Sequence, residues 1–222
     1  MKKNLFLVFL LIITIFPVYA QTPSNPTVIL ESADIPFEKF NVVSNDAIIG
    51  EFESEHTINW QLSIDNNIVY ANPLGTAVIR LYDGTDAEKF VEIGMGSQPD
   101  RKFWVAVKNP EIGYAVIHDR ITDGWSPDYE IIVVYSSTAG LTINNGQRIV
   151  VSNLDVDDFT LKNFAVYGME SSTDPPAANS GNLVLDIVSG NPAANPLFYL
   201  PYALAIGAGV LVVVLLKTKK RT

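Results

Sequence analysis

Two side chains with metal-ligating atoms stand in one stretch of the chain, Val91–Arg120. Met95, one of three methionines, offers a thioether sulfur, and His118, one of two histidines, offers an imidazole nitrogen. Both atoms are accepted ligands of transition metals. Methionine also fills irregular space in protein cores, and a histidine among apolar neighbours is commonly a core residue. The stretch therefore predicts either a ligand pair or two core residues.

Aromatic and acidic side chains follow this pair closely. Asp119 comes directly after His118, and Trp125 and Tyr129 flank a Ser-Pro-Asp turn. Such rings stack on a sugar or cap the edge of a sheet, and both alternatives stay open. We therefore name Met95, His118, Asp119, Trp125 and Tyr129 as the candidate ligand-binding residues, in a pocket near Met95, His118 and Trp125.

The usual constellations of catalytic residues are missing from the sequence. It has two histidines and no Gly-x-Ser-x-Gly elbow, which argues against a serine triad. It has no cysteine, which excludes disulfides, Cys-based zinc sites, iron–sulfur clusters and thiol nucleophiles. We predict that the protein is not an enzyme and has no catalytic residues.

Acidic turns offer carboxylates that could bind calcium. Asp155–Asp158 and Asp83–Asp86 are two such turns, but neither has the terminal Glu of an EF-hand loop. Glu53, Glu55 and His56 cluster at the start of a predicted strand and suggest a metal on composition alone. We interpret all three clusters as solvated turns or strand ends, and predict no metal site.

The first twenty residues have the pattern of a secretory signal peptide. Met1–Ala20 begins with two lysines, continues with an apolar run and ends Val-Tyr-Ala before Gln21. Pro17 breaks the helix that an uncleaved anchor would need, so we predict cleavage after Ala20.

The last residues have the pattern of a membrane span with a cytoplasmic flank. Leu197–Leu216 carries no charge, and at about 1.5 Å per residue it reaches roughly the thickness of a bilayer core. Lys217–Thr222 follows as a basic cluster. A buried helix or a lipid-anchor signal explains this order less well. We predict a single-pass type I protein in the cell membrane, with its ectodomain outside.

The predicted ectodomain is strongly acidic. All 24 acidic residues lie between Gln21 and Pro196, whereas six of the 15 basic residues lie outside this segment, so its formal charge is −15. Nucleic acid and anionic lipid are themselves polyanions and are disfavoured as partners.

The sequence of the ectodomain predicts short strands of alternating apolar and polar residues, separated by turns. One antiparallel β-sandwich over residues 27–189 accommodates them, between a leader at 21–26 and a stalk at 190–196. The expected strands cover Thr27–Leu30, Ala47–Phe52, Ile58–Leu62, Ile68–Tyr70, Ala77–Tyr82, Phe90–Ile93, Phe103–Val107, Tyr114–His118, Tyr129–Tyr135, Gln147–Val151, Leu161–Tyr167 and Leu183–Val188.

Local patterns add finer expectations. Ile58–Leu62 should turn its Trp60 inward and form a hairpin with Ile68–Tyr70. Alternation should place Tyr114 and His118 on one face of their strand. The continuous apolar run of Ile131–Val134 indicates a strand covered on both faces. Ser171–Gly181 is expected to be a long loop.

Several of these segments, in this order, resemble a DOMON domain, an extracellular β-sandwich found in dopamine-monooxygenase-like proteins and in haem- or sugar-binding modules. The similar segments are Trp60–Asp65 with Ile68–Tyr70, Val91–Gly96, Phe103–Val107, Ala115–Arg120, Asn153–Asp158 and Phe164–Gly168. The resemblance covers about residues 57–188 and implies a ligand-binding sandwich.

Cytochrome members of that family hold a b-type haem between a Met after the glycine segment and a His before the last strand. Here the residues after Gly96 read Ser-Gln-Pro-Asp, and Ser171–Gly181 contains no His. The substitutes that the chain offers are Met95 with His118, or Met169 alone. The cofactor is therefore left unassigned, with haem b as the one that the resemblance suggests.

These observations lead to one main hypothesis and two alternatives. The main one is a membrane-anchored, extracellular, non-enzymatic ligand-binding module of DOMON type, whose ligand is a small molecule such as haem or a carbohydrate. The alternatives are a haem b electron-transfer module, and a structural or adhesive protein that contacts another envelope protein.

Overall fold

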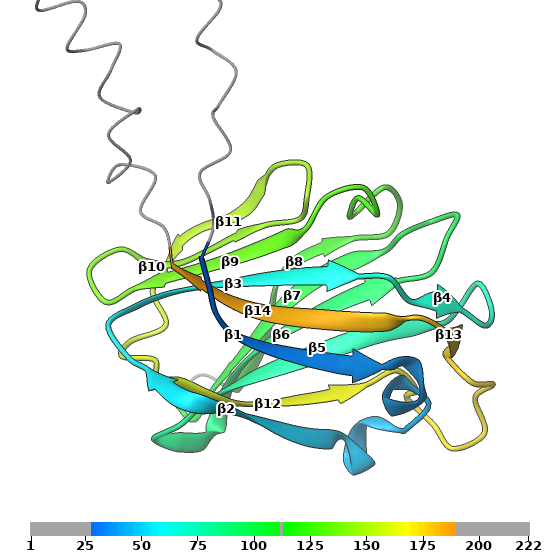
Figure 1. Ribbon diagram of the computed structural model, residues 1–222, viewed down its shortest axis with the longest axis horizontal. Helices are drawn as coiled ribbons and strands as arrows, with labels where there is room; N and C mark the ends of the chain where they lie inside the picture. Colours follow the sequence, from blue (N-terminus) through cyan, green and yellow to red (C-terminus); the bar gives the residue numbers. More distant parts are fainter. Residues whose placement is uncertain (1–27, 112, 190–222) are drawn as a thin grey trace, which may run out of the picture. The chain divides into compact units, whose positions relative to one another are not determined.

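Two six-stranded sheets face each other in the part of the chain that the computed structural model describes, residues 28–111 and 113–189 (Figure 1). Sheet I has the order β1 (Val28–Pro36), β14 (Asn182–Ser189), β3 (Asn59–Asn66), β9 (Ile131–Ser136), β10 (Gly140–Asn144) and β11 (Ile149–Leu154). Sheet II has the order β2 (Ile48–His56), β12 (Leu161–Tyr167), β5 (Thr76–Asp83), β6 (Asp86–Gly96), β7 (Phe103–Asn109) and β8 (Gly113–Arg120).

Smaller elements close one end of the sandwich. The short strands β4 (Val69–Tyr70) and β13 (Ala178–Ser180) pair with each other, and two 3₁₀ helices, η2 (Phe37–Phe40) and η3 (Ser44–Asp46), connect β1 to β2. The prediction of an all-β protein with antiparallel sheets is confirmed.

The ends of the chain fall outside the described residues. The predicted signal peptide at 1–20, leader at 21–26, stalk at 190–196, membrane span at 197–216 and basic tail at 217–222 all lie there. Of the helical segments that the structure does describe, none combines the length and the apolar composition needed to cross a bilayer.

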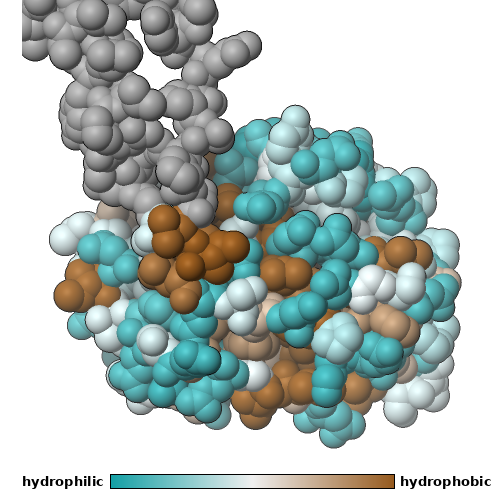
Figure 2. Space-filling view, viewed as in Figure 1, coloured by the Kyte–Doolittle hydropathy of each residue, from teal (hydrophilic) through white to brown (hydrophobic). Residues whose placement is uncertain are grey.

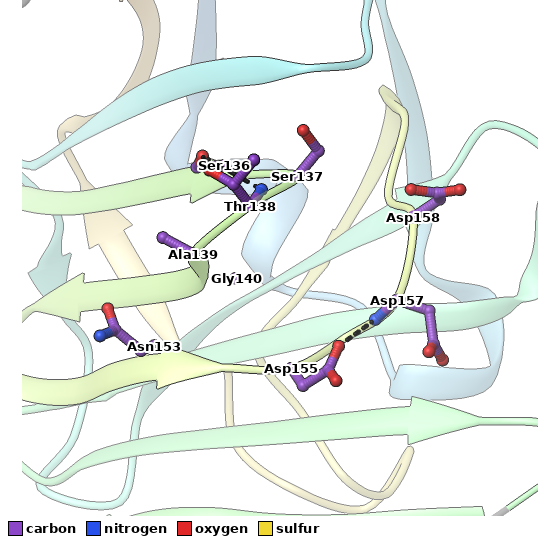
Figure 3. A pocket seen from close by; sticks show the side chains of 9 residues that line it. All are labelled: Ser136, Ser137, Thr138, Ala139, Gly140, Asn153, Asp155, Asp157 and Asp158. Carbon is purple, nitrogen blue, oxygen red and sulfur yellow. Dashed lines mark hydrogen bonds between the residues drawn. The ribbon is translucent and has the colours of Figure 1, made fainter.

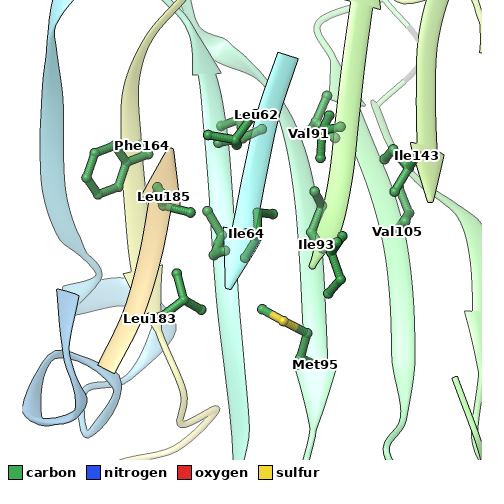
Figure 4. Close-up of a cluster of buried hydrophobic side chains, with 14 of the residues drawn as sticks. Leu62, Ile64, Val91, Ile93, Met95, Val105, Ile143, Phe164, Leu183 and Leu185 are labelled. Atoms are coloured by element: carbon green, nitrogen blue, oxygen red, sulfur yellow. The ribbon is translucent and has the colours of Figure 1, made fainter. Parts of the chain in front are cut away.

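The core fills the space between the two sheets. Period-two alternation turns Ile79, Leu81 and Ile93 of sheet II inward against Leu62 and Ile64 of sheet I, and all five are at most 1% exposed. Figure 4 shows Leu62, Ile64 and Ile93 within this buried cluster. Each such side chain contributes about 1.5–3 kcal/mol through burial. Outward positions are mixed, and Figure 2 shows small hydrophobic clusters separated by hydrophilic residues on the face viewed.

Three aromatic rings fasten the segment before β12 onto sheet I. Trp60 stacks on Tyr135 with ring centroids 5.5 Å apart, and Phe159 packs against both. The Tyr135 hydroxyl accepts a hydrogen bond from the Phe159 N–H at 3.0 Å and donates one to the Asp157 carbonyl at 3.1 Å. Trp60 is 4% exposed, which confirms its predicted inward orientation.

Two predicted pairings differ from the structure. β3 and β4 form no hairpin, because β3 continues to Asn66 and pairs with β14 and β9, while β4 pairs with β13. The Asn66 carboxamide accepts the N–H of Ile68 at 3.1 Å and so redirects the chain between the two strands. The predicted loop at Ser171–Gly181 contains β13, and β10 was not predicted, since only Leu141 and Ile143 turn inward from it.

Two predicted faces also differ. In β8, His118 pairs with Val105 whereas Val116 pairs with Ala106, so Ile117 forms a bulge between them. The bulge puts His118 on the opposite face from Tyr114. The run at the start of β9 is covered on one face only, since Val133 is 0% exposed and Val134 is 36% exposed.

The Tyr135 contacts generate a prediction on stability. Tyr135→Phe removes the acceptor of the Phe159 N–H and leaves a buried donor unpaired, so we expect the free energy of unfolding to fall by about 1–3 kcal/mol. Urea denaturation followed by far-UV circular dichroism measures this. Tyr129→Phe is the matched control because Tyr129 is 70% exposed. Equal stability of the two variants would contradict the prediction.

Candidate functional site

The outer face of sheet II, away from the core, carries a cluster of polar and aromatic side chains. Period-two alternation along the strands turns Arg80 of β5, Glu92 of β6, Trp104 of β7, Tyr114 of β8 and Tyr167 of β12 to this side. Five adjacent strands thus contribute one residue each. We call these five residues the outer-face cluster.

Small residues between the large ones make room for the rings. Trp104 pairs with Gly94, and a Cβ atom at Gly94 would lie 2.0 Å from the indole, so the ring rests directly on the glycine backbone. Ala106 pairs with Glu92 and presents only a methyl group. This leaves Tyr114 space to reach from β8 across β7 to the Glu92 carboxylate on β6.

The Glu92 carboxylate is the centre of the cluster. It accepts hydrogen bonds from Arg80 Nε at 2.8 Å, Tyr114 Oη at 2.8 Å, Tyr167 Oη at 2.9 Å and Trp104 Nε1 at 3.3 Å. The guanidinium of Arg80 also donates to Tyr167 Oη at 3.0 Å, and it stacks on the Tyr167 ring at 4.6 Å. The four donors fix the orientation of every ring in the cluster.

The hydrogen bonds keep this buried carboxylate ionised. The side chain of Glu92 is 4% exposed, and such burial by itself raises a carboxyl pKa. The donated hydrogen bonds, with that from Arg80 the largest, outweigh burial and hold the pKa of Glu92 below its usual value. Burial raises the pKa of Tyr114 and of Tyr167, and the neighbouring negative charge raises both further, so both phenols stay protonated donors.

A surface depression of about 520 Å³ lies over the cluster. Three further charged side chains, Lys102, Asp119 and Glu170, are part of its lining. The Lys102 ammonium lies 3.9 Å from the Asp119 carboxylate and 5.0 Å from the centre of the Trp104 ring. The depression therefore combines a half-buried indole and an exposed phenol ring with hydrogen-bonding groups at its rim.

Met95 and His118 do not fit a haem here. Met95 is 0% exposed among core side chains (Figure 4), and its sulfur lies 3.2 Å from the Asn66 amide nitrogen. Phe103, which pairs with Met95, has its ring 6.1 Å from that of His118. The space that a porphyrin needs is thus filled by packed side chains.

His118 is half-buried, and its Nε2 atom has no hydrogen-bond partner among residues 28–111 and 113–189. Burial lowers the pKa of His118, and the positive charge of Arg148 lowers it further. The imidazole is therefore neutral at pH 7.

The other predicted site residues lie in separate places. Trp125 is 3% exposed and donates from Nε1 to the Gly96 carbonyl at 3.0 Å, so its ring is not available to a ligand. Tyr129 is 70% exposed on a turn. Of the five predicted residues, Asp119 is the one that lines the depression over the outer-face cluster.

Sequence reasoning missed the outer-face cluster although a signal for it exists. Arg80 stands between Ile79 and Leu81, and Glu92 between Val91 and Ile93, so two apolar runs are each interrupted by a charge, and the two charges have opposite signs. Charges at outward positions of two neighbouring strands predict a pair. That the two are opposite each other follows only from the register, in which Arg80 pairs with Glu92.

The acidic turn Asp155–Asp158 lines another depression, of about 510 Å³, near the β9–β10 turn (Figure 3). The Asp155 carboxylate accepts the N–H of Asp157 at 3.0 Å, and the carboxylates of Asp157 and Asp158 lie apart (Figure 3). Among residues 28–111 and 113–189, no group of three or more His, Cys, Asp or Glu side chains is placed to hold a metal ion.

No protein-family model and no curated protein matches the chain. The DOMON resemblance therefore stays a prediction.

Solved structures with a similar fold exist at low identity. One is the carbohydrate-binding module CBM66 from Bacillus subtilis, with 11% identity, a TM-score of 0.40, and coverage of 73% of this chain and 98% of that one. Another is a fructofuranosidase from Schwanniomyces occidentalis complexed with fructose, with 10% identity and a TM-score of 0.41. That match covers 76% of this chain but 35% of the enzyme. At TM-scores of 0.40 and 0.41, we draw no conclusion about this chain from either likeness.

The electrostatics of Glu92 generate a second prediction. Because its folded pKa lies below the unfolded value of about 4.3, ionised Glu92 stabilises the protein above that pH, and this contribution is lost as pH falls through the folded pKa. Glu92→Gln leaves Arg80 without its charge partner and should lower the free energy of unfolding at pH 7 by about 3 kcal/mol. The variant should also lose less stability on acidification than the wild type.

Urea denaturation at a series of pH values from 7 to 3 measures both effects. Glu111→Gln, at an exposed position, is the control. A Glu92→Gln variant with the acid sensitivity of the wild type would rule out the proposed role of this carboxylate.

Proposed function

We propose that the protein binds a carbohydrate on the outer face of sheet II, without catalysing a reaction on it. The observation that carries the proposal is the pair of rings, Trp104 and Tyr114, held over a depression by the buried Glu92 carboxylate. Aromatic faces stack on the C–H faces of a sugar ring, and neighbouring polar groups hydrogen-bond its hydroxyls.

Preorganisation supports binding at this face. Both rings donate a hydrogen bond to a carboxylate that is itself buried and paired with Arg80, so little side-chain entropy remains to be lost when a ligand binds. The rim supplies both a donor, Lys102, and two acceptors, Asp119 and Glu170. A ligand that presents one apolar face and an edge of hydroxyl groups matches this arrangement.

The chemistry of Glu92 favours binding over catalysis. A general acid needs a raised pKa, whereas the pKa of Glu92 is lowered. A nucleophile or base needs a free lone pair, whereas four donors already surround this carboxylate. Glu92 thus holds the rings of Trp104 and Tyr114 in place through the hydrogen bonds that they donate to it.

Removal of the indole tests the proposal. Trp104→Ala should weaken carbohydrate binding about tenfold or more, since about 1.4 kcal/mol of lost stacking corresponds to a factor of 10. A glycan array followed by isothermal titration calorimetry with the array's best ligand measures the change. Trp104→Phe, which keeps a ring, should retain part of the affinity, and Tyr129→Ala should retain all of it.

Intrinsic fluorescence gives an independent readout. Trp60 and Trp125 are 4% and 3% exposed, so Trp104 is the tryptophan that a ligand can reach. Ligand should change the emission of the wild type and not that of Trp104→Phe. A glycan that binds with equal affinity to wild type and Trp104→Ala would overturn the placement of the site, and the absence of any bound glycan would overturn the function.

The proposal places this face outside a membrane. Its support is the sequence alone, namely the apolar run Leu197–Leu216 with the basic cluster after it and the signal-like pattern of Met1–Ala20. The DOMON-like class proposed for the sandwich also consists of extracellular modules.

Extraction of membranes tests the anchor. After expression in cells, the full chain should stay in the membrane pellet at alkaline pH, and a chain that ends at Gly190 should be released. Replacement of Leu204 and Val212 by Lys in the full chain should also release it, because each buried charge costs about 2.5–3.5 kcal/mol. A full chain found in the supernatant would contradict the anchor.

A further inference from the structure

A second depression adjoins the one over the outer-face cluster. It has a volume of about 450 Å³ and lies beyond the ends of β5 and β6. Thr76, Lys102 and Glu170 line both depressions. Because these three residues border both depressions, the two lie next to each other, and we treat them together as one groove.

The second depression offers both apolar contact and hydrogen-bond acceptors. Leu74 and Ile121 line it and are 84% and 69% exposed. The carboxylates of Asp100 and Asp174 line it too. Exposed aliphatic groups beside carboxylates suit the two kinds of surface on a sugar ring, its C–H face and its hydroxyl edge.

The residues of this second depression are held in place. The Asn72 carboxamide accepts the N–H of Leu74 at 2.8 Å and donates to the Pro176 carbonyl at 2.8 Å, which fixes the turn that presents Leu74. The Asp174 carboxylate accepts the N–H of Glu170 at 3.1 Å and that of Ser171 at 2.8 Å. The segment at the junction of the two depressions is therefore ordered before any ligand binds.

Each positive charge in the groove lies beside a carboxylate, and the remaining charges in the groove are negative. The guanidinium of Arg80 faces Glu92 at 2.8 Å, and the Lys102 ammonium faces Asp119. Asp100, Asp174 and Glu170 add further negative charge. A sugar acid would meet like charge here and find each of the two lining cations beside a carboxylate, so the groove suits uncharged sugars.

We propose that this groove binds a linear chain of neutral sugar units, with one unit on Trp104 and Tyr114 and later units over Leu74 and Ile121. This rests on the proposed carbohydrate-binding function and names its ligand class. Each depression alone falls within the range of about 300–1,000 Å³ of small-ligand sites, and the two together accommodate more than one ring.

Affinity as a function of chain length tests the proposal. Full-length protein in detergent is titrated calorimetrically with xylo-, cello- and manno-oligosaccharides of two to six units, and with oligogalacturonates of the same lengths. We expect the best neutral series to gain about tenfold in affinity from two to four units. The double variant Leu74→Ser with Ile121→Ser should lose this gain. Ile49→Ser, at an exposed position on β2, should keep it.

The outcomes separate this proposal from the function on which it rests. Trp104-dependent binding of equal affinity at all lengths would overturn the extended groove and leave carbohydrate binding intact. Tighter binding of the galacturonates than of any neutral series would overturn the ligand class. No binding of any sugar, or binding that Trp104→Ala does not weaken, would overturn the proposed function itself. We expect the double variant to fold, because Leu74 and Ile121 are both exposed, and a thermal melt of each variant checks this.

Discussion

A single ionised carboxylate, that of Glu92, organises one entire face of this protein. An unpaired charge with 4% exposure would be very costly, so the residue requires donors, and side chains on four other strands supply them. The donors are aromatic in three of four instances, and their hydrogen bonds point inward toward Glu92. The requirement to satisfy one buried charge thus turns ring faces outward over a depression. The stability of this face and the surface that we propose for binding have the same physical origin.

Much of the fold could be predicted because one face of each sheet is covered and the other is not. Short apolar segments such as Ala77–Tyr82 and Leu161–Tyr167 identify strands without knowledge of their partners. Pairing is harder to predict, since β4 meets β13 across a long separation in sequence and β10 carries too few apolar residues to stand out. The bulge at Ile117 cannot be read from alternation, because it is a break in alternation.

The candidate site was harder to predict than the fold. Met95 and His118 were named as candidates because their side-chain atoms can ligate metals. Whether such an atom can bind a ligand depends on its surroundings, and Met95 lies in the core. Trp104 gains its place from Gly94 and Tyr114 from Ala106, two small residues with no reactive side chain. Their importance depends on cross-strand register, which a single sequence does not contain. Asp119, which we named as a candidate ligand-binding residue, lines the depression over the outer-face cluster, and its role in binding stays a prediction.

The bulge in β8 has a consequence for the behaviour of the protein at high concentration. β8 is the last strand of sheet II, and Tyr114 and Val116 are 52% and 55% exposed on it. A straight edge strand with apolar side chains is a template on which a second chain can add its own strand, which leads to aggregation. The extra residue at Ile117 interrupts the regular spacing of the free N–H and C=O groups along this edge. The same bulge that alternation cannot predict therefore disfavours the addition of a strand from a second molecule to the exposed edge of β8.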